Sequence, residues 1–167
     1  MAFQPVDRPA MIASLLGEQL EDSEPLVKEL STRIILLSSV IEKLNQPMFQ
    51  ARKINRGLTT ILTALRLSGQ PYELHHQQLH ERILLSSVSI FNGCESLRDL
   101  DLLTISSNEI DHTESVYKLT LDGIDVAGQV LVSIHQTEKK IFATLDEDEK
   151  TLLCKLLKTV TQQVDAS

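Results

Sequence analysis

The length, composition and charge of the chain exclude several classes of protein. It has 167 residues, which suits one domain, or one compact domain with a dimerisation extension. Four Phe, two Tyr and no Trp leave Leu, Ile and Val to build the core, as in a helical bundle. The net charge of −7 argues against a surface that binds nucleic acid non-specifically, although it does not exclude a local basic patch.

The sequence contains no motif for a membrane span, a signal peptide or catalysis. No apolar run approaches the roughly 20 residues that cross a bilayer, and the N-terminal residues lack the basic-then-apolar pattern of a signal peptide. Cys94 and Cys154 have no metal-ligand spacing and are expected to pack as small apolar side chains. No P-loop, nucleophile elbow, dinucleotide-binding turn or zincin motif is present. We therefore expect a cytoplasmic, reduced protein that is not an enzyme and binds no metal or cofactor.

The N-terminal segment, residues 1–23, is expected to form a tail with a short helix over about 11–20. Asp22 or Ser23 would cap the helix that follows. Pro25 would occupy the first turn of that helix, where proline costs least.

Two further helices follow in the first half of the chain. From 26 to 44 an apolar residue recurs at every third or fourth position, which predicts a helix of about five turns that ends at Asn45, Gln46 and Pro47. Apolar residues over 54–65 predict a second helix that stops near Gly69.

The middle of the chain predicts two short helices and a hairpin. The helices run over about 75–82 and 86–99, and Ser86 or Ser87 caps the second. The β-branched segments "LLTIS" and "SVYKLT", separated by the polar run "SNEIDHTE", predict two strands joined by a loop longer than the tightest turns.

The C-terminal part returns to helix. An apolar face from Leu121 to Ile141 predicts a long helix. Asp146 and Glu149 then form a capping-box pattern before a final leucine-rich helix.

The element order and three motifs together resemble one known family. The order is that of a winged helix flanked by dimerisation helices. "SGQPYELHHQQLHERILLSSVSIFNGCESLRDLDLL" is similar to that family's short helix, "L-S" pair and recognition helix, and "LDEDEKTLLCKLLKTV" is similar to its last helix. "VYKLTLDGIDVA" fits its "V-x-L-T-x-x-G" exit from the wing at Val116, Leu119, Thr120 and Gly123. Over roughly residues 24–164 the chain thus resembles the MarR family of dimeric bacterial transcriptional regulators.

The resemblance implies a mainly α fold, a winged helix-turn-helix with a two-stranded β wing and terminal dimerisation helices. Residues 24–50 and 121–167 would supply the dimerisation helices, and residues 51–120 the DNA-binding region. It also implies a homodimer, double-stranded DNA as a partner and, in many members, a small anionic or aromatic effector.

DNA contacts are expected on the recognition helix, on the wing and on a basic cluster at the second helix. In the recognition helix Asn92 would read adenine, and Arg98 would reach a phosphate or a base edge. The predicted contacts are Ser87, Ser89, Asn92 and Arg98 on that helix, His112, Thr113 and Lys118 on the wing, and Arg52, Lys53 and Arg56 in the basic cluster.

The chain differs from the family at the residues that are expected to contact DNA. The wing arginine is replaced by Thr113, followed by Glu114, and a carboxylate is repelled by the minor groove. Between positions 75 and 120 three Lys and Arg face seven Asp and Glu. A rival hypothesis therefore keeps the fold but not DNA binding, and makes the subunit a protein-interaction or DNA-mimicking module that uses an exposed Phe91.

The basic cluster has two interpretations. Arg52, Lys53, Arg56 and Arg66 occur with no acid from 51 to 67, so they form either a displaced phosphate-binding patch or a counter-charge for acidic surfaces of the dimer.

Arg33 and Arg56 are the candidates to hold an anionic effector. Arg33 lies within an apolar helix, and an interhelical salt bridge is the favoured interpretation.

Three histidines occur together. His76 and His80 have a spacing that zinc uses, but polar side chains on an exposed short helix are the favoured interpretation of His75, His76 and His80.

Overall fold

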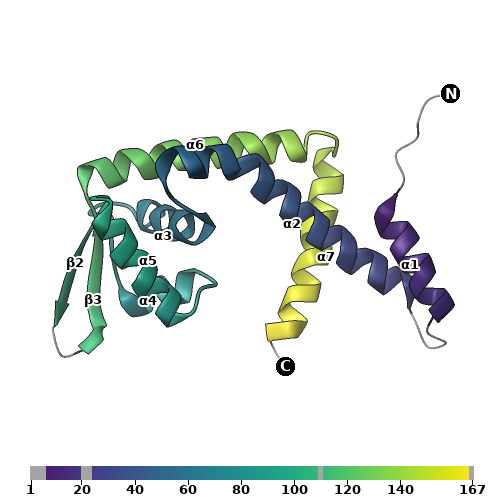
Figure 1. Cartoon of the computed structure of the whole chain (residues 1–167), viewed down its shortest axis with the longest axis horizontal. Coiled ribbons are helices and arrows are strands. Elements are labelled where there is room, and N and C mark those ends of the chain that lie inside the picture. The colour runs from purple at the N-terminus through teal and green to yellow at the C-terminus, as the bar shows by residue number, and fades with distance from the viewer. Residues whose placement is uncertain (1–6, 20–23, 109–110, 166–167) are drawn as a thin grey trace. The chain divides into compact units, whose positions relative to one another are not determined.

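The computed structural model describes residues 7–19, 24–108 and 111–165, and these segments form seven helices and three strands (Figure 1). The fold is mainly α, as predicted. Contacts divide the chain into two units, residues 1–44 and 45–167. The elements are α1 (Arg8–Gln19), α2 (Pro25–Arg52), α3 (Arg56–Leu67), β1 (Glu73–His75), α4 (His76–Arg82), α5 (Ser87–Asp99), β2 (Leu103–Asn108), β3 (Asp111–Leu119), α6 (Leu121–Ile141) and α7 (Glu147–Asp165).

The first unit contains α1 and most of α2. Pro25 is the first residue of α2, as predicted, while the predicted capping residues 22–23 lie outside the described residues. Arg33 joins the segment before α1 to α2, because its Nη2 donates to Asp7 Oδ2 at 2.7 Å and its Nε donates to Glu29 Oε1 at 2.8 Å. The interhelical alternative for Arg33 predicted an ion pair of this kind.

The predicted end of α2 at Pro47 is wrong, because the helix continues through that proline to Arg52. A proline inside a helix removes one backbone hydrogen bond. Phe49 and Asn45 are buried on either side of it, and Phe49 packs into the core of the second unit. Tertiary packing therefore outweighs the local cost of the proline.

The core of the second unit lies between α3, α5, α6 and the sheet. The helix α3 buries Leu58, Ile61, Leu62 and Leu65, and α5 packs directly on it. Gly93 permits that approach, since a Cβ at this position would lie 2.5 Å from Ile61 Cδ1. Its place in α5 therefore has a packing reason.

The predicted two-stranded wing is formed by β2 and β3, and a third strand that was not predicted, β1, joins it. The order is β1-β3-β2, with antiparallel pairing throughout, and Leu74 of β1 is buried opposite Tyr117 of β3. The strands β2 and β3 are also longer than predicted, because Asn108 pairs with Asp111. Much of the polar run that was expected to be a loop is therefore strand.

The two C-terminal helices begin with local caps, of which the second was predicted. Thr120 caps α6, since its Oγ1 accepts from the N–H of Gly123 at 2.9 Å. The capping box before α7 is confirmed: the N–H of Glu149 donates to Asp146 Oδ1 at 2.8 Å, and the N–H of Asp146 donates to Glu149 Oε2 at 2.9 Å.

Candidate nucleic-acid interface and adjoining pocket

The pair α4 and α5 forms a helix-turn-helix. Ser86 caps α5, as predicted, because its Oγ accepts from the N–H of Ser89 at 3.2 Å. The helix packs against α3, α4 and β2. Its inward face is Ile90, Gly93, Cys94 and Leu97, so the orientation of the helix is fixed by the core.

The outward face of α5 carries several polar side chains and little charge. Ser89, Asn92 and Ser96 are all exposed and recur at helical spacing. Together with Asn55 and Gly57 at the start of α3 they line a shallow cavity of about 310 Å³. The structure therefore brings two of the predicted DNA contacts, Ser89 and Asn92, beside the N-terminus of a second helix.

Ser87 and His76 have roles that the sequence does not predict. His76 is buried rather than exposed; its Nε2 lies 2.6 Å from Ser87 Oγ and its Nδ1 lies 3.0 Å from the hydroxyl of Tyr117. Burial, and then the charge of His80, lower the pKa of His76. Burial raises the pKa of Tyr117 to about 12. Ser87 is exposed, but its hydroxyl is engaged by the buried His76.

Two residues expected to be available on α5 are occupied. The Arg98 guanidinium pairs with the Glu95 carboxylate and lies 3.5 Å from Asp99 Oδ1. Phe91 is half-buried, so the exposure on which the rival hypothesis relied is wrong.

The wing is described in part. Lys118 lies on β3 and its Nζ pairs with Glu73 Oε2 of β1 at 3.0 Å. His112 and Thr113 belong to β3 in backbone, but their side chains lie outside the described residues.

The basic cluster is divided between two surfaces. Lys53, in the turn between α2 and α3, adopts a left-handed backbone conformation with φ 56°, and Arg56 is the exposed first residue of α3. Arg52 and Arg66 instead line a cavity of about 700 Å³ against α6. Arg66 was not assigned to an effector site from the sequence, because only its proximity to α6 reveals it.

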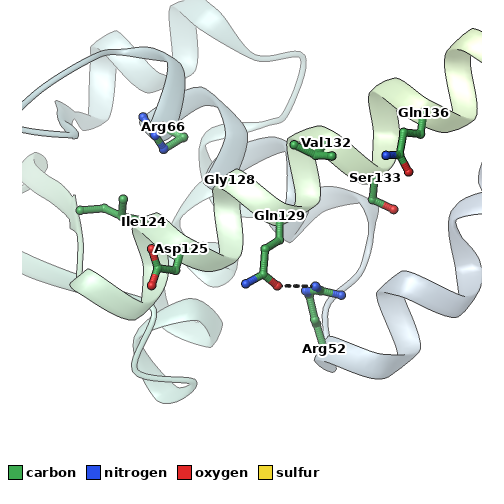
Figure 2. Close-up of a pocket in the computed structure, with 9 residues that line it drawn as sticks. All are labelled: Arg52, Arg66, Ile124, Asp125, Gly128, Gln129, Val132, Ser133 and Gln136. Atoms are coloured by element: carbon green, nitrogen blue, oxygen red, sulfur yellow. Dashed lines mark hydrogen bonds between the residues drawn. The ribbon is translucent and has the colours of Figure 1, made fainter.

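The cavity against α6 combines cationic, amide and apolar groups. Figure 2 shows its α6 residues following one another along the helix, with Gln129 and Arg52 pointing toward each other. Arg52 Nη2 donates to Gln129 Oε1 at 2.7 Å. Arg66 lies over the Tyr72 ring, 4.7 Å from its centroid, and its Nε is buried with no hydrogen-bond partner among the described residues. The other lining residues are Ile124, Asp125, Gly128, Val132, Ser133 and Gln136.

The predicted effector residues do not line this cavity. Arg33 belongs to the first unit and is engaged by Asp7 and Glu29, while Arg56 lies at the start of α3. No cluster of three or more His, Cys, Asp or Glu suited to a metal occurs in the described part of the chain. Across the same residues no helix is long and apolar enough to cross a membrane.

No protein-family model and no curated protein matches the sequence, whereas many solved structures match the fold. The organohalide-sensing regulator RdhR, seen ligand-free and with 2,4-dichlorophenol, matches at TM-score 0.72 and 20% identity over 98% of this chain and 88% of its own. NadR in complex with 4-hydroxyphenylacetate matches at TM-score 0.64 and 18% identity, over 82% of this chain and 98% of its own. A mutant of MarR from E. coli complexed with operator DNA matches at TM-score 0.66 and 17% identity, over 78% of this chain and 92% of its own.

These similar structures are transcriptional regulators, not enzymes. At 17–20% identity the three matches above establish architecture. The chain therefore has the winged-helix fold of the MarR regulators.

Proposed function

We propose that this chain is a MarR-like DNA-binding transcriptional regulator that acts as a homodimer and responds to a small effector. The observation that carries the proposal is the exposed polar face of α5 in a helix-turn-helix, beside the N-terminus of α3. A helix placed in this way fits a major groove, and Asn55, Gly57 and Arg56 at the start of α3 suit a phosphate.

DNA binding is tested by a salt titration. Fluorescence anisotropy of a mixed genomic duplex with the full-length protein should show affinity that falls roughly tenfold to a hundredfold between about 50 mM and 200 mM salt. Arg56→Ala should reduce the slope of log affinity against log salt by about two, because each subunit of the dimer loses one phosphate contact. Lys139→Ala, at the far end of α6, is the matched control. No binding at about 50 mM salt would refute the DNA-binding function.

The homodimer is supported by apolar side chains that the single chain leaves exposed. On α2 they include Leu26, Leu30 and Ile34, and on α7 Leu152, Leu156 and Val160. Such stripes on terminal helices are typical of surfaces that a second copy covers. Leu156→Asp should shift the protein to monomer in analytical ultracentrifugation, whereas Lys158→Asp, on the opposite face of α7, should leave a dimer. A wild-type monomer at micromolar concentration contradicts the proposal.

The effector site is proposed at the α6 cavity in place of Arg33 and Arg56. Its volume suits a small ligand, and Arg52 and Arg66 offer donors to a carboxylate or phenolate. NadR is a suitable guide because it is seen with 4-hydroxyphenylacetate. Calorimetry with that acid should show binding that Arg66→Ala weakens at least tenfold and Lys139→Ala leaves unchanged. Equal affinity in all three proteins would remove the site from the proposal.

The rival protein-interaction function retains two supporting observations, one of which is that Thr113 and Glu114 stand where the wing arginine is expected. Acidic residues outnumber basic ones across the reading region, but Phe91 no longer supports it. A stable heterocomplex with another protein, isolated without DNA binding, would favour the rival.

A further inference from the structure

The outward face of α5 presents an apolar and an amide side chain together. Val88 is 70% exposed, and Asn92, one turn later on the same face, is exposed as well. Ile90, Cys94 and Leu97 on the opposite face are fully buried. Because the core fixes the rotation of α5, any base pair that meets this face meets Val88 and Asn92 side by side.

Asn92 has the chemistry of an adenine reader. Its amide makes no hydrogen bond within the described part of the chain, which leaves one acceptor and two donors available. In the major groove an Asn amide accepts from adenine N6 and donates to adenine N7 at once. Ser89 and Ser96 flank it on the cavity side and are compatible with either base pair.

Val88 has the chemistry of a thymine reader. The C5 methyl group of thymine is the one apolar feature at the major-groove edge, and apolar side chains recognise it by contact. Leu84, in the turn just before α5, is fully exposed and extends this apolar surface. The exposed side chains of Leu84 and Val88 contribute no burial energy to the fold of this chain.

Guanine lacks a reader on this helix. Guanine is recognised by the paired donors of Arg or Lys at O6 and N7. Arg98 is the only Lys or Arg in α5, and Glu95 and Asp99 hold its guanidinium. The same carboxylates would repel the two guanine acceptors.

We propose that α5 selects A·T base pairs, with Asn92 reading adenine and Val88 the thymine methyl group. This inference rests on the proposed DNA-binding function. It assigns a class of operator, A·T pairs at the major-groove positions that α5 meets.

The first test is selection of bound duplexes from a random pool with the full-length protein at about 50 mM salt. The selected positions should be enriched in A·T pairs for the wild type and lose that enrichment for Asn92→Ala. Thr144→Ala, a polar truncation in the exposed turn before α7, should keep it. Enrichment of guanine at the positions protected by α5 would overturn the inference.

The second test replaces single groups on the selected duplex. Deoxyuridine in place of thymine removes one methyl group and should weaken wild-type binding about threefold to fourfold, yet leave Val88→Ala unaffected. Adenine with carbon at N7 should weaken the wild type about tenfold, yet leave Asn92→Ala unaffected. If both variants lose as much as the wild type, these residues are not the readers.

The outcomes separate the two proposals. No binding to any duplex defeats the DNA-binding function and this inference together. Salt-dependent binding with no A·T preference, or with a guanine preference, defeats this inference alone.

Discussion

His76 and Tyr117 are joined by a buried hydrogen bond, with 3.0 Å between His76 Nδ1 and the Tyr117 hydroxyl, although 41 positions separate them in the sequence. Their ring centroids lie 5.9 Å apart. Since His76 Nε2 also contacts Ser87 Oγ at 2.6 Å, one imidazole connects α4, the first residue of α5 and the wing strand β3. It therefore fixes the proposed reading helix relative to the wing.

Removal of the Tyr117 hydroxyl is expected to destabilise the protein. Tyr117→Phe should lower the free energy of unfolding by about 1–2 kcal/mol, because the buried His76 Nδ1 loses its partner. Urea denaturation measures this. The matched control is Tyr72→Phe, which keeps the ring beneath Arg66 and should change stability by less than about 0.5 kcal/mol. Equal effects of the two variants would contradict the role given to the hydrogen bond.

The stability of the fold should depend on the protonation of His76. Its pKa is lowered in the folded protein below the ordinary value of 6.5, so the unfolded chain binds the proton more readily. The stabilisation is therefore present above pH 6.5 and is lost as pH falls below it. The stability difference between wild type and His76→Gln should shrink over that range in urea titrations. A difference that stays constant over that range would exclude His76 as the cause.

Two glycines of α6 should respond to alanine in opposite ways. A Cβ at Gly123 would overlap the backbone carbonyl of Leu102, so Gly123→Ala should cost at least about 2 kcal/mol. A Cβ at Gly128 would meet nothing within 4 Å, so Gly128→Ala should stabilise the helix by about 0.5–1 kcal/mol. Thermal unfolding of both variants measures the difference. Similar melting temperatures would show that the contact between α6 and the start of β2 is looser than described.

Cys94 should be chemically inert in the folded protein. Burial, and then the charge of Glu95, raise the pKa of its thiol to about 12, and only the thiolate is an effective nucleophile. Iodoacetamide at pH about 8 should leave Cys94 unmodified in the native state and alkylate it in urea. Peptide mass spectrometry reports the site. Alkylation of the native protein at this residue would indicate that α5 opens from α3 far more often than its packing suggests.

The sequence predicts the features that depend on near neighbours. Ser86 and Asp146 cap their helices as expected, because each cap is completed within three residues. The apolar periodicity also places α3, α6 and α7 well. The features that depend on distant partners were missed. The strand β1 has three residues and depends on its pairing with β3. The helix α2 continues past Pro47 because Phe49 packs into the core of the second unit.

In the candidate site, too, the features set by near neighbours were predicted and those set by distant partners were not. The helical spacing of Ser89 and Asn92 is sufficient to place both on one face of α5. The burial of His76, the partial burial of Phe91 and the engagement of Arg98 depend on tertiary packing, and Cys154 is exposed although packing was expected. The cavity against α6 combines Arg52 and Arg66 with Gln129, a residue far along the chain, which no local pattern reveals.

The most direct test of the central claim, that α5 is the reading helix, is the affinity of a Ser89→Glu variant for duplex DNA at about 50 mM salt. A carboxylate on the exposed face of α5 would oppose the phosphates, so binding should weaken at least about tenfold. Thr144→Glu, in the exposed turn before α7, adds the same charge elsewhere and should bind as the wild type does. If Ser89→Glu binds DNA as tightly as Thr144→Glu, α5 does not face the DNA and the account is contradicted.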